Sequence, residues 1–274
     1  MQTPSSHSIR LSSEESRSRR LFSALLLGSP LNSSPYRSPR TPKPPAPEPV
    51  SFEKLFKKLE KINVFEEDVS SKELGALLLS SLPTFSGEDV QKTAEFLCES
   101  ACAHDNIYVV VELLVATASS ASLKSAISQE IVKVASDFIL EDNTINDSLP
   151  EFFAQVLIAR FARPYNRSCD TSNEILFTVI SIVQGWIDVL KGKSESEPSK
   201  ENEKMRIRCV EGIAGICWSA RRRLWLSWPS LVDGIYVAIE NVLIGDIGLA
   251  KSSKKQLLKL FVDINKWPKA DSKN

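Results

Sequence analysis

The sequence predicts an all-α protein made of stacked antiparallel helical hairpins, with about ten helices and a disordered N-terminal tail. Three observations favour this fold class. From Ser51 to Trp267, apolar side chains recur every three or four residues, which is the spacing of one face of an α-helix. Prolines and short polar segments separate these periodic stretches. Nine of the fifteen prolines fall within residues 1–49, which predicts that this part does not fold like the rest.

Residues 1–50 are expected to form a disordered regulatory tail. This segment has too little apolar surface to offset the entropy lost on ordering, and residues 42–49 favour an extended polyproline conformation. The tail holds seven Arg or Lys against three Glu, whereas the formal net charge of the whole chain is zero, so the remainder is mildly acidic. A basic tail on an acidic body favours contact with an anionic partner.

Short motifs in the tail indicate control by a cell-cycle kinase. The tetrapeptide RRLF resembles the cyclin-docking motif, in which the cation of Arg19 would meet an acidic rim while Leu21 and Phe22 enter an apolar groove. Each added phosphate would contribute about −1.5 to −2 charges, so two or three could reverse the charge of the tail. A cyclin-dependent kinase is therefore a candidate partner. The candidate phosphorylation sites, each followed by proline, are Ser29, Ser34, Ser38 and Thr41.

The apolar octamer Leu21–Gly28 leaves a mitochondrial presequence open as a competing interpretation. Such leaders are rich in Arg and Ser, as this region is, but Glu14 and Glu15 lie inside it and Pro30 ends any longer helix. No apolar run approaches the ~20 residues that a membrane-spanning helix requires, so no membrane contact is expected. The expected location is the cytoplasm, with the nucleus as a second compartment.

Residues 51–268 are expected to form the helical-repeat domain. The run 107–115 is rich in β-branched residues and is compatible with a strand, but no alternating partner strands lie nearby, so a buried helix is favoured. The polar segment 190–204 is expected to be a mobile loop within the domain. The expected helices cover residues 52–63, 71–82, 87–103, 106–120, 122–141, 149–163, 172–191, 203–219, 230–244 and 252–266.

Capping signals mark three of the helix starts. Each signal pairs a hydroxyl with a carboxylate three residues later, so that the hydroxyl accepts a free amide and the carboxylate reaches back to the cap. The three pairs are Ser86 with Asp89, Ser148 with Glu151, and Thr171 with Glu174.

Two of the expected helices are apolar around most of their circumference, namely those containing residues 175–190 and 207–218. A stack of hairpins buries its central helices on two sides, by their own partner and by the neighbouring pair. This pattern favours a superhelix of the HEAT or armadillo type, although no repeat is visible in the sequence.

No set of catalytic or metal-binding residues can be assembled from the sequence, so we expect no enzyme, no cofactor and no metal site. The motifs of nucleotide-binding loops, serine hydrolases and zinc proteases are absent. Cys98, Cys102 and His104 resemble part of a metal site, but no second ligand group follows at a useful spacing. The five cysteines are therefore expected to be buried free thiols. The opposing hypothesis, an unrecognised enzyme, predicts a deep polar pocket with shifted pKa values.

The densest cluster of unusual residues places Arg221, Arg222 and Arg223 just before Trp225 and Trp228. Guanidinium groups beside indoles suit phosphate contact with base stacking, which makes this segment a candidate surface for RNA or a protein partner. In the favoured interpretation, the tryptophans close the core and the arginines face water or an acidic helix. Three further residues extend the candidate surface, namely Lys251, Lys254 and Lys255.

The C-terminal segment 239–267, IENVLIGDIGLAKSSKKQLLKLFVDINKW, resembles the last helical pair of the middle domain of eukaryotic translation initiation factor 4 gamma. Its closing stretch QLLKLFVDINKW is similar to the ending of the compact family members, the poly(A)-binding-protein-interacting translation factors. The likeness extends more loosely over residues 51–268. The cluster of arginines and tryptophans and the hydrophobic third pair depart from the family pattern, so no binding residue is carried over.

The resemblance implies five helical hairpins that act as a scaffold, since family members bind the initiation helicase, other initiation factors or RNA and perform no chemistry. The expected function is therefore a non-enzymatic interaction scaffold in mRNA translation or mRNA metabolism. It would bind translation factors, with RNA as a further candidate partner. The alternative is a helical-repeat adaptor in cell-cycle or nuclear assembly that docks cyclin through the RRLF motif.

Overall fold

The structure is a computed structural model, and it describes residues 47–64, 70–103, 106–140, 147–161, 173–192, 200–245 and 249–267. The chain divides into two compact units, Met1–Pro45 and Ala46–Asn274, and every described residue belongs to the second unit. Most of the expected tail, residues 1–46, lies outside the described residues, as does the central part of the expected loop, residues 193–199.

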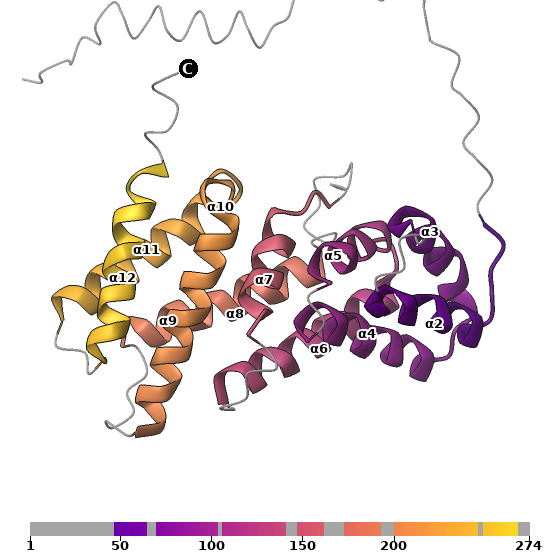
Figure 1. Cartoon of the computed structure of the whole chain (residues 1–274), viewed down its shortest axis with the longest axis horizontal. Coiled ribbons are helices and arrows are strands. Elements are labelled where there is room, and N and C mark those ends of the chain that lie inside the picture. Colours follow the sequence, from indigo (N-terminus) through magenta and orange to yellow (C-terminus); the bar gives the residue numbers. More distant parts are fainter. Residues whose placement is uncertain are drawn as a thin grey trace, which may run out of the picture. The chain divides into compact units, whose positions relative to one another are not determined.

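Within the described ranges the regular structure is entirely helical, with no strand (Figure 1). This confirms the predicted all-α class. The α-helices are α2 (Phe52–Glu60), α3 (Ser71–Ser81), α4 (Gly87–Cys102), α5 (Ile107–Ala116), α6 (Ala121–Leu140), α7 (Leu149–Ile158), α8 (Glu174–Leu190), α9 (Lys200–Ala220), α10 (Arg222–Ser227), α11 (Pro229–Ile244) and α12 (Lys251–Ile264).

The helices pack in two rows, and helices that follow one another along the chain alternate between the rows, apart from the short α10. In one row α3, α5, α7, α9 and α12 each contact the next, and in the other α4, α6, α8 and α11 do the same. Consecutive helices also contact across the rows, as α2 with α3, α4 with α5, α6 with α7, α8 with α9 and α11 with α12. The described part of the second unit is thus a stack of five helical hairpins, which is the repeat-like architecture expected from the sequence.

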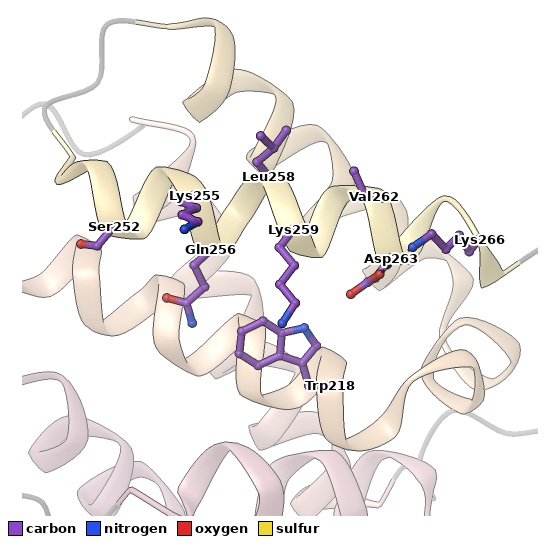
Figure 2. A pocket seen from close by; sticks show the side chains of 9 residues that line it. All are labelled: Trp218, Ser252, Lys255, Gln256, Leu258, Lys259, Val262, Asp263 and Lys266. Carbon is purple, nitrogen blue, oxygen red and sulfur yellow. Dashed lines mark hydrogen bonds and ion pairs between the residues drawn. The ribbon is translucent and has the colours of Figure 1, made fainter.

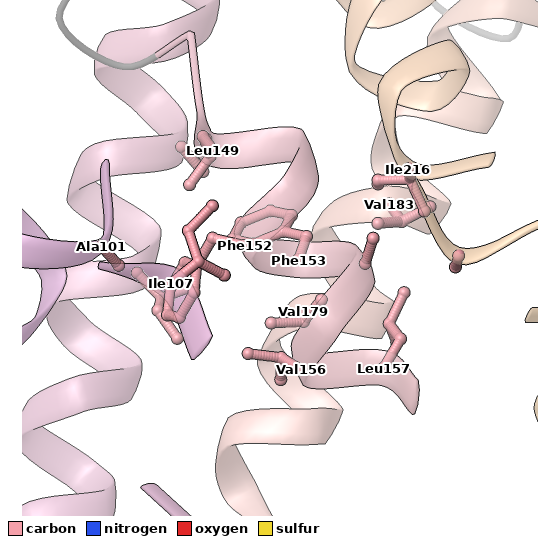
Figure 3. Packing of buried hydrophobic residues seen from close by; sticks show 14 of the residues in the cluster. Ala101, Ile107, Leu149, Phe152, Phe153, Val156, Leu157, Val179, Val183 and Ile216 are labelled. Atoms are coloured by element: carbon pink, nitrogen blue, oxygen red, sulfur yellow. The ribbon is translucent and has the colours of Figure 1, made fainter. Parts of the chain in front are cut away.

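The core runs continuously through both rows, because each central helix is covered by its own partner and by the neighbouring pairs. Helix α7 lies at its centre, and its Phe152 and Phe153 are among the largest fully buried side chains (Figure 3). Phe153 stacks on Trp186 of α8, with ring centroids 5.7 Å apart and planes 20° apart. Burial of such rings contributes the largest apolar areas in a helical core.

The apolar run 107–115 is helical, as favoured, and its side chains Ile107, Val110, Leu113 and Leu114 are almost completely buried. A helix satisfies its backbone hydrogen bonds internally, so it can be buried between two hairpins without a partner strand. The high content of β-branched residues is explained by burial and not by strand formation.

Of the three predicted capping pairs, one forms, one does not, and one includes a residue outside the described residues. Ser86 and Asp89 form the expected capping box at the start of α4. Ser148 makes no side-chain cap hydrogen bond, and its backbone is already helical (φ −80°, ψ −7°) instead of extended as in a typical cap. Thr171 lies outside the described residues, and the cap of α8 is Asn173, whose side chain accepts from the amide of Ile175.

Several helix ends differ from the expectation. Helix α7 ends at Ile158 instead of residue 163, and α9 begins at Lys200, inside the segment 190–204 that was expected to be a loop. Pro229 lies at a helix boundary, as expected, because it follows α10 and occupies the first turn of α11, where the missing amide costs no hydrogen bond. The short helix α10 is additional, because Arg221 adopts a positive φ of 48° and separates it from α9.

Candidate partner-binding groove

The three arginines predicted as a surface lie at the junction of α9 and α10. Arg221 and Arg223 are exposed, and Arg222 is half-buried. The Nε of Arg222 donates to the carbonyl of Trp267 at 3.2 Å, which ties α10 to the end of α12. The Nε of Arg221 donates to the carbonyl of Trp218 at 3.2 Å, which satisfies one of the last carbonyls of α9.

The tryptophans of this cluster belong to the core, as the favoured interpretation stated. Trp225 and Trp228 are half-buried and pack against the hydrophobic core. The indole Nε1 of Trp228 donates to the carbonyl of Leu157 at 2.7 Å, so its polar atom is also used inside the protein. These two rings are therefore not free platforms for stacking on a ligand.

A different tryptophan faces an open groove. Trp218, near the end of α9, is 37% exposed and lies across the groove from α12 (Figure 2). The groove has a volume of about 710 Å³ and is mostly apolar. It is lined by Trp218, Ser252, Lys255, Gln256, Leu258, Lys259, Val262, Asp263 and Lys266.

Helix α12 forms the long wall of this groove because its two faces differ. Leu257, Leu260 and Ile264 are buried against the rest of the stack. On the other side, Leu258 is 53% exposed and Val262 is 46% exposed. These two residues are four positions apart, so they lie on the same side of the helix and form an apolar strip.

Lysines surround the apolar strip. The ammonium of Lys259 lies 5.3 Å from the ring centroid of Trp218, within the range of a cation–π interaction. Lys266 pairs with Asp263 at 3.1 Å, and Lys255 is exposed at the other end of the groove. Three lysines and one aspartate line the groove, so its charge is positive.

The sequence prediction identified part of this groove. Lys255 lines it, whereas Lys251 and Lys254 lie on the first turn of α12 without lining it, and the three arginines lie beyond its lining. Trp218 and Lys259 were missed as a pair, because their contact joins positions that are forty-one residues apart in the sequence. Polar residues recur every three or four positions along α12 and mark its solvent-exposed face. This pattern was the sequence signal that could have located the groove.

A second, smaller groove of about 270 Å³ lies between α6 and α8. Its lining is apolar apart from Ser136 and consists of Val132, Ala135, Ser136, Ile139, Leu140, Ile182 and Trp186. No charged side chain lines it, so it offers less chemical selectivity than the groove of α9 and α12.

The thiols are buried, as predicted for Cys98, Cys102, Cys209 and Cys217, whereas Cys169 and His104 lie outside the described residues. Burial raises the pKa of Cys102, Cys209 and Cys217 to about 12. Burial also raises the pKa of Cys98, with smaller contributions from Cys102 and Glu130. These four thiols stay protonated at neutral pH, which makes them poor nucleophiles and poor metal ligands. No group of three metal-ligating side chains occurs among the residues that the structure describes.

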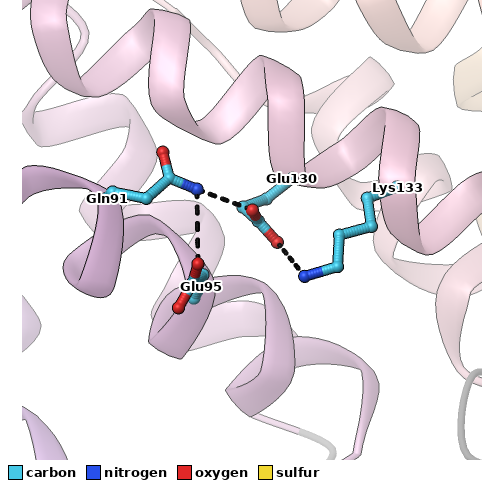
Figure 4. Close-up of polar contacts among 4 residues, drawn as sticks. All are labelled: Gln91, Glu95, Glu130 and Lys133. Atoms are coloured by element: carbon cyan, nitrogen blue, oxygen red, sulfur yellow. Dashed lines mark hydrogen bonds and ion pairs between the residues drawn. The ribbon is translucent and has the colours of Figure 1, made fainter. Parts of the chain in front are cut away.

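Glu130 of α6 is a buried carboxylate, and the polar network around it joins α6 to α4 (Figure 4). Gln91 Nε2 donates to Glu130 at 2.6 Å and to Glu95 at 3.5 Å, and Lys133 pairs with Glu130 at 3.6 Å. The side chain of Glu130 is thus hydrogen-bonded and charge-paired within the protein. This network stabilises the contact between two helices of one row.

The tail motif and its modification sites cannot be placed in this arrangement. Arg19, Leu21, Phe22 and the four Ser/Thr-Pro positions all lie outside the described residues. Among the helices that the structure does describe, none is long and apolar enough to span a membrane.

Comparison with known proteins identifies one family. A family model described as a repeat of unknown function, DUF7627, matches residues 55–274, which is most of the chain and includes all of the groove. No curated protein and no solved structure matches. The chain therefore belongs to the DUF7627 repeat family.

Proposed function

We propose that this protein is a non-enzymatic interaction scaffold in mRNA translation or mRNA metabolism, which binds translation factors through the groove between α9 and α12 and has RNA as a further candidate partner. The observation that carries this proposal is the groove itself, where an exposed indole, an apolar strip and three lysines meet on one surface. These groups provide apolar contact area and positive charge, which are features of a binding surface.

Two further observations support the scaffold role. The groove lies in the segment whose sequence resembles the middle domain of initiation factor 4 gamma, and the five hairpins equal the number that this resemblance implies. A stack of hairpins exposes extended surfaces along its rows, which suits the binding of other macromolecules.

The chemistry of the described residues also favours binding over catalysis. Among the described residues, the shifted pKa values belong to four buried thiols. Each of these pKa values is raised, which favours the protonated and unreactive form. Asp263, the carboxylate that lines the groove, is paired with Lys266.

The proposal is tested by purifying the tagged full-length chain from cells after ultraviolet crosslinking, and by measuring copurified initiation factors and crosslinked RNA. A Lys255→Glu/Lys259→Glu double variant inverts the charge of the groove and is expected to reduce recovery at least about tenfold. Lys54→Glu/Lys58→Glu, at exposed positions of α2, is the matched control and should retain wild-type recovery. Recovery of neither translation factors nor RNA with the wild-type chain would contradict the proposal.

A further inference from the structure

We infer that the groove between α9 and α12 binds an acidic amphipathic helix of a partner protein. This inference rests on the proposed function and names the chemistry of the partner at the same surface. Its support comes from the length of the groove, its apolar strip and the sign of its charge.

The length of the groove fits a helical ligand. The lining residues on α12 extend from Ser252 to Asp263, which corresponds to about 17 Å of helix axis at the standard rise, and Lys266 follows just after the end of the helix. Across the groove, α9 contributes Trp218. A furrow between two helices of one row is a site where a third helix can lay its apolar face, as in helix-in-groove recognition.

The apolar strip supplies the anchor points for such a helix. Leu258, Val262 and Trp218 each expose between 37% and 53% of their surface to solvent. Leu258 and Val262 are one turn apart, so leucine-sized side chains three or four residues apart on a partner helix could contact both. Covering these groups removes apolar surface from water, which favours binding.

The charges around the strip select an acidic partner. Lys255, Lys259 and Lys266 line the groove, and the single carboxylate, Asp263, is already paired with Lys266. A ligand with glutamate or aspartate on its polar face would meet these ammonium groups, whereas a basic ligand would be repelled. Charges at the edge of an apolar contact contribute mainly to selectivity and association rate.

RNA is the less suitable occupant. Binding of single strands relies on several aromatic faces on which successive bases stack. Trp218 is the single aromatic side chain in the groove lining, and Lys259 already lies over its ring. Leu258 and Val262 provide aliphatic surface, which suits apolar side chains better than bases.

The inference is tested by fluorescence anisotropy with the full-length chain and a labelled synthetic peptide of about 16 residues, long enough for four helical turns. The peptide carries leucine at helical spacing on one face and glutamate on the other. We expect saturable binding that weakens as salt rises, because the lysine contacts are solvent-exposed. Val262→Asp should weaken binding at least about tenfold by placing a like charge in the apolar strip.

The control variant is Val237→Asp on α11, which makes the same substitution at a valine of nearly equal exposure, 44% against 46%, outside the groove lining. It should change peptide affinity by less than about twofold. Equal losses in the two variants would overturn the inference, as would failure of the peptide to bind the wild-type chain.

Two further probes separate the possible occupants. A peptide with lysine in place of every glutamate should not bind, and equal binding of both peptides would overturn the inference. Tighter binding of a single-stranded oligouridine, weakened by Val262→Asp, would assign the groove to RNA and also overturn it. Peptide binding without recovery of translation factors or RNA from cells would keep the inference and reject the proposed function.

Discussion

At the scale of single residues, Gly212 of α9 lies in close contact with Trp186 of α8. A Cβ atom at position 212 would lie 2.5 Å from Cζ3 of the indole, which is closer than carbon atoms approach without displacement. Trp186 is held between Phe138 and Phe153, with both ring centroids 5.7 Å from its own. Gly212 is therefore required for the close approach of α8 and α9.

Gly212→Ala is expected to lower the free energy of unfolding by about 1–3 kcal/mol, because the strain of overpacking exceeds the gain in helix propensity. The matched control is Gly185→Ala in α8, where a Cβ would meet open space. This exposed substitution should raise the free energy of unfolding by about 0.5–1 kcal/mol. Urea unfolding measures both values, and stabilisation by both variants would show that α8 and α9 are further apart than described.

At the scale of elements, Trp228, which directly follows the short helix α10, donates a hydrogen bond to α7 and packs its ring against the core. Helix α7 ends at Ile158, so the carbonyl of Leu157 has no partner within the helix. The indole N–H of Trp228 supplies this partner at 2.7 Å, while its ring packs against the core. The contact holds the segment that connects α9 to α11 against α7.

Trp228→Phe keeps an aromatic ring but removes the donor to Leu157. We expect a loss of about 1–3 kcal/mol in the free energy of unfolding, because a partly buried carbonyl loses its hydrogen bond. Trp218→Phe, at the exposed indole of the groove, is the control and should change stability by less than about 0.5 kcal/mol. Equal effects of the two substitutions in urea unfolding would show that the Trp228 hydrogen bond does not stabilise the fold.

At the scale of the whole molecule, the described stack presents a groove and the sequence adds a basic tail. The last helix of one row, α12, contacts α9 and α11 in the described structure, and its other side remains exposed. Phosphorylation at three of its Ser/Thr-Pro sites would change the charge of the tail from basic to acidic. The tail is thus a proposed regulatory element of the chain.

The tail prediction concerns phosphorylation of the full-length chain by a cyclin-bound kinase. Arg19→Ala/Leu21→Ala should slow phosphate incorporation at least about tenfold, because the docking motif then lacks its cation and one apolar anchor. Arg10→Ala/Leu11→Ala alters the same residue types elsewhere in the tail and should leave the rate unchanged. If the Arg19/Leu21 variant is phosphorylated as fast as the wild type, RRLF does not dock a cyclin.

The sequence by itself determined the helical class, most helix positions and the burial of the four described thiols, because the period of apolar side chains and the chemistry of helix caps act over a few neighbouring residues. It also placed Lys255 on an exposed helix face. Only the tertiary structure decided that Trp218 borders a groove, that Lys259 meets its indole, and that the carbonyl of Leu157 accepts the indole N–H of Trp228. These outcomes depend on which helices pack together, and the local pattern of a helix does not specify its distant neighbours.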